Sequence, residues 1–528
     1  MTKKFLLSGN EAIAMAARDC RVSLGVGYPG TPSSEILDEF SKLGGKAQWA
    51  PNEKVSLEVA IGGSFAQGRC MATMKHVGVN VAADPLFTIA YSGTPGGLVL
   101  ISADDPGMAS SQNEQDNRRY AISAGVPLLE PSDSQEAYDY TIKAFELSEK
   151  YHTLVILRMT TRVCHSKSIV TPAENIAPAP AISYTKDVKS NVMIPAYAKL
   201  AHKRMRQRLA DIAAFNESSD FVKEEINSNE LGIIASGISY MHARDAAPEA
   251  SFLKIGLSYP LPIERIKAFA AKVKRCVVVE EGDPIVADAC RAAGINVESK
   301  DEIYRFGELN VGRVRRILAN DKVDETPLPG GKPPQLCPGC PHRKSYEVLR
   351  DLNLIVTGDI GCYTLGVLPP FEAIDSCVCM GASITTGLGL RHVLPEKDAK
   401  RVVSVIGDST FWHTGINGIV EMVYNRPATG HVVVILDNGT TAMTGLQEHA
   451  GTGRHLDNSA SDKLVIEDVL KAMKVDNVDI IDTTLENERY KALLEERLAS
   501  NDISVIIARR PCILGVAKLA KAAKKEVK

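Results

Sequence analysis

The sequence lacks the long apolar runs, the concentrated charge and the leader segment that mark several protein classes. No apolar run approaches the roughly 20 residues that a membrane-spanning helix needs, and residues 1–10 hold only a brief apolar patch. The formal net charge is −3, with one basic run at residues 518–528. Because nucleic-acid binding needs a concentrated basic surface, we expect a cytoplasmic protein with neither nucleic acid nor a membrane as its partner.

A disulfide framework is also not expected. The chain has 11 cysteines in 528 residues, and large cytosolic proteins keep their thiols reduced. Closely spaced cysteine pairs are therefore candidates for a metal or cluster site. The length suggests roughly three or four domains, because one hydrophobic core does not serve so many residues. Hydrophobic residues at 45% and charged residues at 24% are ordinary for a globular protein.

Apolar strand-like runs alternate with helical patterns along most of the chain, which is typical of an α/β fold with parallel sheets. Composition divides the chain into residues 1–185, a charged helical linker at 186–228, a second α/β unit at 229–325, and residues 326–528, which begin in a stretch rich in Pro and Gly. The expected elements include strands at Val77–Ala82, Gly97–Ser102, Leu231–Ala235, Cys276–Glu280, Arg401–Ile406 and His431–Leu436, and a helix at Gln135–Tyr151.

Two β-branched runs in the last segment each end in residues with side-chain oxygens. The two runs and the residues that follow them are Val402–Ile406 with Gly407, Asp408 and Ser409, and Val432–Leu436 with Asp437, Asn438, Gly439 and Thr440. The carboxyl ends of neighbouring parallel strands form the edge at which open α/β sheets bind cofactors. Gly407 would let the chain turn and let a diphosphate approach. A pair of ordinary strand-to-loop turns is the alternative.

The oxygen groups at this edge match the preference of Mg²⁺ for octahedral oxygen coordination with few protein ligands beside phosphate oxygens. The side chains of Asp408 and Asn438 and the backbone carbonyl of Thr440 are the candidate ligands. The two motifs together resemble the thiamine-diphosphate (ThDP) signature, in which Gly-Asp-Gly is followed after a spacer by Asn-Asn. Ser409 in place of the second Gly and Asp437 in place of the first Asn are departures, but the ligand positions are kept.

A second motif lies near the N-terminus, where Asn52 and Glu53 open a helical run with small residues. ThDP enzymes similarly place a Glu before such a helix with a Gly nine positions on, and Gly62 stands nine positions after Glu53. A buried carboxyl group hydrogen-bonded to the aminopyrimidine ring shifts that ring toward the imino tautomer that deprotonates the thiazolium carbon. We therefore expect Glu53 to be catalytic. Glu58 is the competing candidate, and support of the helix N-terminus is the structural alternative for Glu53.

Further stretches narrow the resemblance to one family. The chain, from Ser8 to about Cys512, resembles the alpha subunit of indolepyruvate:ferredoxin oxidoreductase, in the 2-oxoacid:ferredoxin oxidoreductase family. The stretches that carry the resemblance are YPGTPSSE at Tyr28–Glu35, DDPGM at Asp104–Met108, NEQDN at Asn113–Asn117, CPGCPHR at Cys337–Arg343 and GDIGC at Gly358–Cys362.

The resemblance implies an α/β fold with two parallel-sheet ThDP domains, one for the pyrimidine at 1–185 and one for the diphosphate at 326–528, and a transketolase C-terminal-like domain at 229–325. It implies ThDP-dependent oxidative decarboxylation of a 2-oxoacid, an arylpyruvate such as indolepyruvate, to acyl-CoA. The implied partners are a smaller beta subunit in an α2β2 or larger assembly, coenzyme A, and ferredoxin or another iron–sulfur acceptor. A non-oxidative ThDP decarboxylase or ligase and a non-catalytic subunit are the alternatives.

By the same resemblance, Thr31 would hydrogen-bond the carboxylate or oxo group of the substrate. The residues expected to border the cofactor are Tyr28, Pro29, Gly30 and Gly381, with Cys377 and Cys379 packed beside it. The alternative is a Pro-rich turn in which Thr31 or Ser33 is a helix N-cap.

The resemblance also concerns the substrate acid. Oxidoreductases for small or dicarboxylate 2-oxoacids grip the acid with an Arg that precedes the Glu-Gln pair. The corresponding position here is Gln112 or Asn113. Loss of this charge fits a larger, less polar substrate such as an arylpyruvate, although Arg118 or Arg119 could compensate.

The cysteine motif predicts an iron–sulfur cluster. The two-residue gap between Cys337 and Cys340 suits one edge of a cluster, and the resemblance adds Cys362 and Cys512, so that four thiolates would hold a 4Fe–4S cluster. A zinc site and a structural Pro-rich loop are alternatives. We expect the chain to lack the ferredoxin-like domain that follows in the family, so further clusters would lie on a partner chain, or the electrons would leave by another route.

Overall fold

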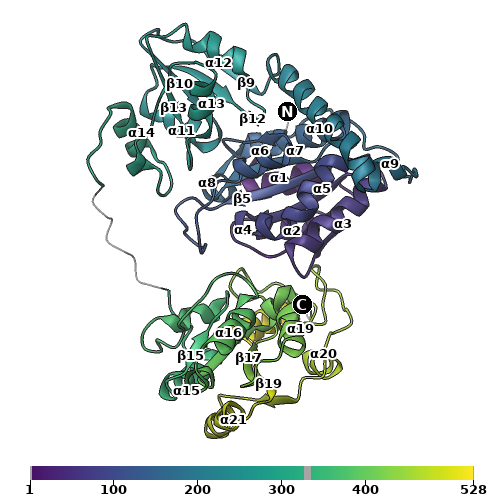
Figure 1. The fold of residues 1–528 in the computed structure, drawn as a ribbon. Coiled ribbons are helices and arrows are strands. Elements are labelled where there is room, and N and C mark those ends of the chain that lie inside the picture. The colour runs from purple at the N-terminus through teal and green to yellow at the C-terminus, as the bar shows by residue number, and fades with distance from the viewer. Residues whose placement is uncertain (1–2, 326–333, 527–528) are drawn as a thin grey trace. The chain divides into compact units, whose positions relative to one another are not determined.

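The computed structural model describes residues 3–325 and 334–526 of the chain. The chain forms two compact units, residues 1–327 and 328–528, and in each unit helices pack on sheets in which parallel strand pairs predominate (Figure 1). The expected α/β class is confirmed. In this described part, no helix combines the length and the apolar character that crossing a membrane requires.

The first unit contains a seven-stranded sheet with the strand order β12-β6-β7-β5-β4-β2-β3. Neighbouring strands are parallel except β12 and β6. The strands are β2 (Leu24–Gly27), β3 (Ala47–Trp49), β4 (Cys70–Lys75), β5 (Leu98–Asp104), β6 (Leu128–Leu129), β7 (Val155–Thr160) and β12 (Leu257–Tyr259). Every residue of β5 and β7 is buried, as expected where both faces of a parallel sheet are covered.

Two helical layers cover this sheet. Helices α3 and α5 share an apolar cluster with β4 and β5, and α1 packs against α2 and α7. The helices are α1 (Gly9–Asp19), α2 (Ser34–Lys42), α3 (Glu53–Phe65), α4 (His76–Val81), α5 (Ala83–Ser92), α6 (Arg118–Ala124), α7 (Ser134–Tyr151) and α8 (Thr161–His165). The strands β1 (Phe5–Ser8) and β8 (Lys167–Val170) form a separate antiparallel pair.

The strand predicted at Val77–Ala82 is wrong, whereas the predicted strand and helix at Gly97–Ser102 and Gln135–Tyr151 are confirmed as β5 and α7. Residues 76–81 form helix α4, and the strand is β4 directly before it. The alternating valines favour a strand. The chain instead leaves the sheet after Lys75 and brings Gly78 so close to Glu53 that a Cβ at Gly78 would lie 2.6 Å from the carboxyl Oε1.

A second, five-stranded sheet in the same unit has the order β14-β13-β10-β11-β9, with only β9 antiparallel to its neighbour. Its strands are β9 (Val222–Glu225), β10 (Leu231–Ala235), β11 (Ser251–Ile255), β13 (Arg275–Val279) and β14 (Glu298–Ser299). The helical segments around it are α11 (Gly237–Ala246), α12 (Ile263–Ala270), α13 (Ile285–Ala292), the 3₁₀ turn η1 (Glu302–Tyr304) and α14 (Val311–Leu318). The predicted strands at Leu231–Ala235 and Cys276–Glu280 are confirmed.

The segment at 186–228 is helical in its first part. It contains α9 (Val188–Asn191) and the 22-residue helix α10 (Pro195–Asn216). Its last part differs from the prediction of a linker, because β9 pairs with β11 and so belongs to the second sheet.

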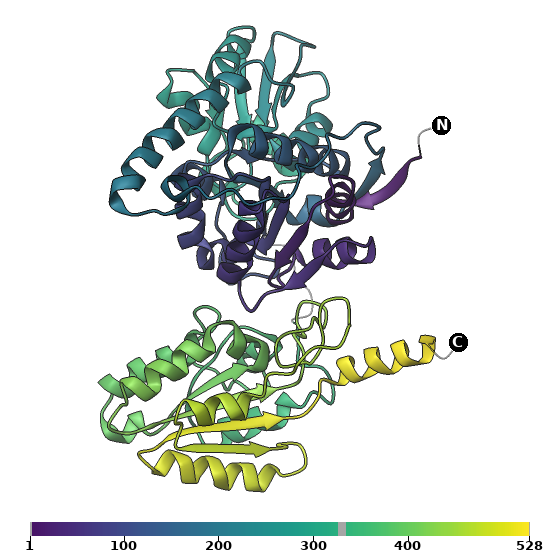
Figure 2. The same cartoon turned by 90° about the vertical axis from the view of Figure 1, so that its right-hand side faces the viewer.

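The second unit holds one five-stranded, fully parallel sheet with the order β15-β16-β17-β19-β18 (Figure 2). The strands are β15 (Ile355–Thr357), β16 (Val402–Gly407), β17 (His431–Asp437), β18 (Asn477–Ile481) and β19 (Ile503–Arg509). The helical segments are α15 (His342–Asp351), η2 (Cys362–Val367), α16 (Ala382–Val393), α17 (Glu396–Ala399), α18 (Asp408–Thr410), the π-helical η3 (Phe411–Gly415), α19 (Ile416–Tyr424), α20 (Ile466–Ala472), α21 (Asn487–Ala499) and α22 (Ile513–Glu526).

Strand β17 shows why this sheet is buried on both faces. Successive side chains of a strand point to opposite faces. Val432 and Val434 join the apolar cluster that includes α15 and α21, whereas Val433 and Ile435 join the cluster that includes α16, α19 and α20. Helices on both sides of the sheet therefore explain why this strand is apolar throughout. The apolar run stops at Leu436, one residue before β17 ends at Asp437.

Candidate active site

Glu53 begins helix α3 in a buried position. The side chain of Asn52 caps the helix by accepting a hydrogen bond from the N–H of Val55 at 3.0 Å. The Glu53 side chain packs against the Cα of Gly78, and the residue is only 5% exposed. Glu58, the competing candidate, is exposed and forms an ion pair with Lys54. The structure therefore favours Glu53 as the buried carboxyl group.

The small residue that brings α3 close to β4 is Gly63. A Cβ at Gly63 would lie 2.4 Å from the Sγ of Cys70, whereas a Cβ at Gly62 would meet no atom within 4 Å. Within residues 3–325, Gly62 faces open space.

The loop at residues 28–33 is held by its own backbone and serines. The N–H of Gly30 donates to the hydroxyl of Ser34 at 2.9 Å, and the hydroxyl of Ser33 donates to the carbonyl of Gly30 at 2.9 Å. Ser33 precedes α2 but makes no capping hydrogen bond with its side chain, so the N-cap alternative is not borne out for it. Tyr28 and Pro29 are buried, whereas Thr31 is half-buried.

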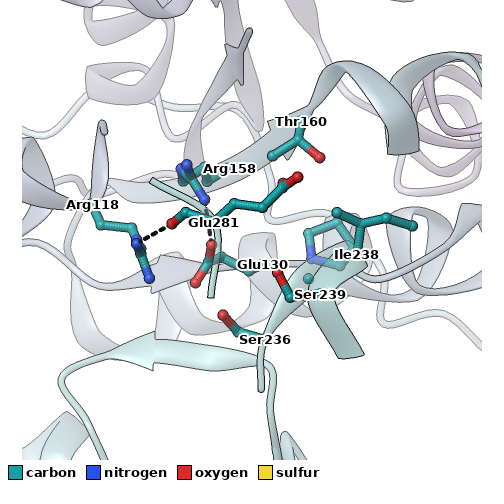
Figure 3. Close-up of a pocket in the computed structure, with 10 residues that line it drawn as sticks. Arg118, Glu130, Arg158, Thr160, Ser236, Ile238, Ser239 and Glu281 are labelled. Atoms are coloured by element: carbon teal, nitrogen blue, oxygen red, sulfur yellow. Dashed lines mark hydrogen bonds and ion pairs between the residues drawn. The ribbon is translucent and has the colours of Figure 1, made fainter. Parts of the chain in front are cut away.

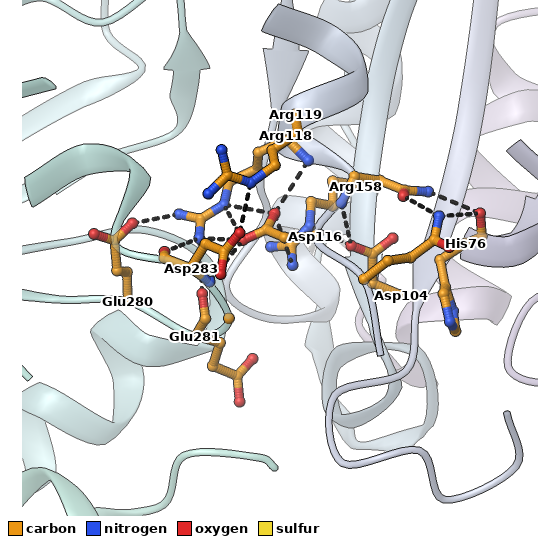
Figure 4. Close-up of polar contacts among 12 residues, drawn as sticks. His76, Asp104, Asp116, Arg118, Arg119, Arg158, Glu280, Glu281 and Asp283 are labelled. Atoms are coloured by element: carbon orange, nitrogen blue, oxygen red, sulfur yellow. Dashed lines mark hydrogen bonds and ion pairs between the residues drawn. The ribbon is translucent and has the colours of Figure 1, made fainter. Parts of the chain in front are cut away.

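The two arginines considered for substrate binding are engaged elsewhere (Figure 4). Arg118 is 2% exposed, and its guanidinium contacts the carboxylates of Asp116 at 2.5 Å and Glu280 at 2.6 Å. Arg119 is exposed and pairs with Asp283 at 2.5 Å. Both guanidinium groups have carboxylate partners in the segment after β13. They therefore attach the start of α6 to the second sheet and do not replace the missing acid-gripping Arg.

Further buried ion pairs lie next to those of Arg118. Arg158 on β7 contacts Asp104 and Glu130, each at 2.6 Å. A small pocket beside this cluster is lined by Arg118, Glu130, Arg158, Thr160 and Glu281, among other residues (Figure 3). Burial raises the pKa of Glu281 to about 7, and the hydrogen bond from the N–H of Leu309 only partly offsets it.

In the second unit, the register of β16 and β17 brings the two predicted motifs together. Gly407 pairs with Leu436, so the residues that follow these strands are neighbours. The Oδ2 of Asp408 accepts a hydrogen bond from the N–H of Gly439 at 2.7 Å and lies 3.2 Å from the Nε2 of His449. Burial alone would raise the pKa of Asp408, but the His449 imidazole and the backbone donors outweigh it, and the pKa is lowered.

Asn438 is oriented by two neighbours. Burial lowers the pKa of His342 to about 4, so its neutral imidazole accepts a hydrogen bond from the Nδ2 of Asn438 at 3.1 Å. The Oδ1 of Asn438 accepts from the N–H of Thr440 at 3.1 Å. An anionic oxygen from Asp408 and a neutral oxygen from Asn438 therefore stand at one sheet edge, which is the donor set that Mg²⁺ prefers.

The two departures from the ThDP signature have structural explanations. The Ser409 hydroxyl lies 2.8 Å from that of Thr441, so it links the ends of β16 and β17. Asp437 pairs with Arg509 at 2.6 Å, and Arg509 also pairs with Glu467 at 2.7 Å. The charge of Asp437 is therefore compensated by the neighbouring strand β19.

Two predicted glycines are required for close packing. Gly407 has an ordinary extended φ of −83°, so the turn expected there is not the reason for glycine; a Cβ would lie 2.5 Å from the ring of Tyr363. Gly381 has a φ of +84°, and its Cβ would lie 1.9 Å from the Oγ1 of Thr414. The N–H of Gly381 donates to the buried carboxylate of Asp359 at 2.8 Å.

Sequence reasoning missed Asp359 and His449. Asp359 lies in the GDIGC stretch, which was interpreted only through its cysteine, yet its carboxylate accepts the N–H groups of Gly381 and Ser383 at the start of α16. His449 has no motif of its own and is brought to Asp408 by the loop after β17.

The four predicted cluster cysteines are half-buried and lie in one neighbourhood. Burial raises the pKa of Cys362 to about 11, and the thiols of Cys340, Cys512 and Cys337 each contribute to this pKa. Among residues 3–325 and 334–526, however, no three His, Cys, Asp or Glu side chains are arranged to hold one metal ion. The Mg²⁺ and 4Fe–4S sites therefore stay predictions.

The other cysteines divide into buried and exposed groups. Cys377 and Cys379 are exposed in the second unit, and their expected packing beside the cofactor stays a prediction. The buried cysteines are Cys20, Cys70, Cys164, Cys276 and Cys290.

Two family matches cover the parts of the chain that hold Glu53 and Asp408. Residues 14–209 match the family described as Pyruvate flavodoxin/ferredoxin oxidoreductase, thiamine diP-bdg. Residues 359–508 match the family described as Thiamine pyrophosphate enzyme, C-terminal TPP binding domain. Both matches support the binding of ThDP, the cofactor that the two sequence motifs predict.

Relatives of the whole chain decide the family. Indolepyruvate oxidoreductase subunit IorA from Archaeoglobus fulgidus is 39% identical over 97% of this chain and 87% of its own length. The chain belongs to the IorA family. IorA from Methanothermobacter marburgensis is 38% identical with the same coverage. This IorA-family chain is thus an alpha subunit of the 2-oxoacid:ferredoxin oxidoreductase type, as the motifs predict.

A solved structure supports the fold of this IorA-family chain. The 2-oxoglutarate:ferredoxin oxidoreductase from Magnetococcus marinus, solved with 2-oxoglutarate, coenzyme A and succinyl-CoA bound, matches with a TM-score of 0.52. The match covers 61% of this chain and 65% of the other at 17% identity. At this identity the likeness concerns the fold alone.

Proposed function

We propose that this IorA-family chain is the ThDP-binding subunit of an enzyme that converts an arylpyruvate, such as indolepyruvate, to an acyl-CoA by oxidative decarboxylation. The observation that carries the proposal is the buried Glu53 against Gly78 in a chain whose relatives are named indolepyruvate oxidoreductase. In this proposal residues 1–185 bind the pyrimidine, residues 229–325 form the middle domain, and residues 326–528 bind the diphosphate.

Each proposed residue has a defined task. Bound ThDP supplies a carbanion nucleophile and an electron sink. Glu53 exchanges a proton with the aminopyrimidine nitrogen from its buried position. Asp408, Asn438 and the carbonyl of Thr440 hold Mg²⁺ against the diphosphate, with His342 fixing the orientation of Asn438.

The remaining proposed residues act on the substrate and shape the pocket. The Thr31 hydroxyl donates a hydrogen bond to an oxygen of the substrate. The residues proposed to border the cofactor are Tyr28, Pro29, Gly30, Gly381, Gly407 and Ser409.

The electrons leave through an iron–sulfur route in this proposal. Cys337, Cys340, Cys362 and Cys512 hold a 4Fe–4S cluster in this proposal. Its support is that, in addition to burial, neighbouring thiols of this set raise the pKa values of Cys340 and Cys362. A smaller beta subunit completes an α2β2 or larger assembly, coenzyme A receives the acyl group, and ferredoxin or another iron–sulfur protein receives the electrons.

The proposal is tested on protein co-purified anaerobically with its beta subunit. The Glu53→Gln variant should lose about 10²- to 10⁴-fold in turnover of arylpyruvates, because the amide cannot exchange the proton, while ThDP affinity stays within a few-fold. Glu58→Gln, an exposed change on the same helix, is the matched control and should turn over at the wild-type rate. Unchanged turnover in the Glu53 variant would remove this residue from the mechanism.

Iron and sulfide analysis of the same preparation tests the redox part. About four iron and four sulfide atoms per chain are expected from one cluster, and Cys362→Ser should lower both values. Iron-free protein that still turns over 2-oxoacids would contradict oxidative chemistry and favour a non-oxidative decarboxylase.

A further inference from the structure

Lys75 is the last residue of β4, at the carboxyl edge of the seven-stranded sheet. Its stem lies against the loop at residues 28–33, since a Cβ at Gly30 would be 3.1 Å from the Cβ and 3.7 Å from the Cδ of Lys75. Its ammonium donates to the carbonyl of Ser110 at 2.5 Å. The side chain therefore stands between the loop that carries Thr31 and the loop after β5.

The Lys75 ammonium lacks a carboxylate partner. No carboxylate among residues 3–325 forms an ion pair with it, and burial lowers its pKa, although Asp105 and Glu53 act in the opposite direction from a distance. The Asp105 carboxylate is occupied by hydrogen bonds from the N–H of Ser110 and the hydroxyls of Ser111 and Thr161 at 2.8, 2.5 and 3.0 Å.

The arginines around this sheet edge are all compensated. Figure 4 shows the pairs of Arg118 with Asp116 and Glu280, of Arg119 with Asp283, and of Arg158 with Asp104. Two further pairs join Arg158 with Glu130 and Arg162 with Glu308. A partly buried cation without a counter-charge is unfavourable. Lys75 thus differs from the arginines around it, and the anionic group of a bound ligand would supply the missing counter-charge.

We infer that Lys75 binds the carboxylate of the 2-oxoacid substrate. The inference rests on the proposed function, in which the reacting carbon lies near the cofactor that Glu53 activates, and Glu53 acts on the pKa of Lys75. Lys75 takes the task that sequence reasoning left to Arg118 or Arg119. A single ammonium without a carboxylate partner at this sheet edge, among residues 3–325, suits a monocarboxylate with an apolar side chain better than a dicarboxylate.

The test compares an anionic and a neutral substrate analogue in the intact enzyme with its beta subunit. The two probes are the methyl ester of an arylacetylphosphonate, which keeps a negative charge at the carboxylate position, and the amide of the same arylpyruvate. Lys75→Met should weaken the phosphonate about 10- to 100-fold, as expected for one lost charged hydrogen bond. Amide binding and ThDP affinity should stay within twofold.

Two further variants keep the result interpretable. Lys75→Arg retains the charge and should recover part of the phosphonate affinity, and Lys54→Met, an exposed lysine on α3, is the matched control that should change neither probe. Equal weakening of both probes, or of neither, in an enzyme that still turns over 2-oxoacids overturns the role of Lys75 and leaves the proposed function standing. A wild-type enzyme that binds neither probe overturns both.

Discussion

The carboxyl edges of two parallel sheets in this chain carry opposite chemistry. At the edge of the seven-stranded sheet, the guanidinium groups of Arg118 and Arg158 are held in buried ion pairs, whereas no carboxylate of residues 3–325 pairs with the Lys75 ammonium. At the edge of the sheet in the second unit, the side-chain oxygens of Asp408 and Asn438 are available, and the imidazoles of His449 and His342 contact these two side chains. In the proposed function, the first edge binds the anionic substrate and the second binds a cation with its phosphates.

The two edges also differ in the tasks of their polar groups, because those of the first stabilise the fold and those of the second are proposed to bind a cofactor. The ion pairs of the first edge tie two sheets of one unit together, because Arg118 lies beside the seven-stranded sheet and Glu280 follows β13 of the other. At the second edge, Asp408 accepts from the N–H of Gly439 and lies beside the His449 imidazole, and Asn438 accepts from the N–H of Thr440, so these contacts stay within the loops of one unit. Changes at the first edge should therefore lower stability, and changes at the second should lower cofactor affinity.

The largest expected effect is on stability at the first edge. Arg118→Met would leave the buried carboxylate of Glu280 without its cation and Asp116 with only the more distant Arg158 at 3.6 Å. This should lower the free energy of unfolding by about 3–5 kcal/mol. Arg119→Met, which removes an exposed pair with Asp283, is the control and should change it by less than about 1 kcal/mol. Denaturant unfolding of both variants gives the two values, and similar values would erase the proposed distinction between buried and exposed pairs.

A smaller effect concerns pH. The pKa of Glu281 is raised from 4.5 to about 7 in the folded chain, so the folded state holds the proton more tightly than the unfolded state. The contribution of Glu281 to stability is therefore full below about pH 4.5 and is lost as the pH rises through about 7, which amounts to about 3 kcal/mol. Glu281→Gln keeps an acceptor for the N–H of Leu309 but cannot ionise.

Unfolding experiments at pH 5 and pH 8 measure this contribution. The wild-type chain should lose about 3 kcal/mol more than the Glu281→Gln variant between the two pH values. Glu302→Gln, at an exposed site that pairs with Arg305, should follow the wild-type curve. Parallel curves for wild type and Glu281→Gln would show that the buried cluster does not hold a proton on Glu281.

The same two edges differ in how far the sequence predicts them. In the second unit the strands end directly in Asp408 and Asn438, so one contiguous motif per strand was enough, and the register of β16 and β17 confirms that the two are neighbours. The short apolar runs also predicted most strands, because helices bury both faces of these sheets.

The first edge could not be predicted in the same way. Lys75, Gly30 and the loop at 105–111 are far apart in sequence, and only the order of β2, β4 and β5 in the sheet brings them together. Arg118 looked available because its partner Glu280 lies 162 positions away. Ion pairs between residues so far apart in sequence leave no local pattern that would predict them. The sequence at 76–81 likewise gives no local pattern for the helix that brings Gly78 against Glu53.

Calorimetric titration of Mg²⁺ and ThDP into the wild-type chain and the Asp408→Asn variant tests most directly whether this chain binds ThDP through the edge of β16 and β17. The wild type should bind ThDP only with Mg²⁺ present, and Asp408→Asn should bind it about 100-fold or more weakly because the anionic ligand is lost. Asp437→Asn, whose carboxylate serves Arg509, should stay within about tenfold of the wild type. Wild-type ThDP affinity in the Asp408→Asn variant would contradict this assignment.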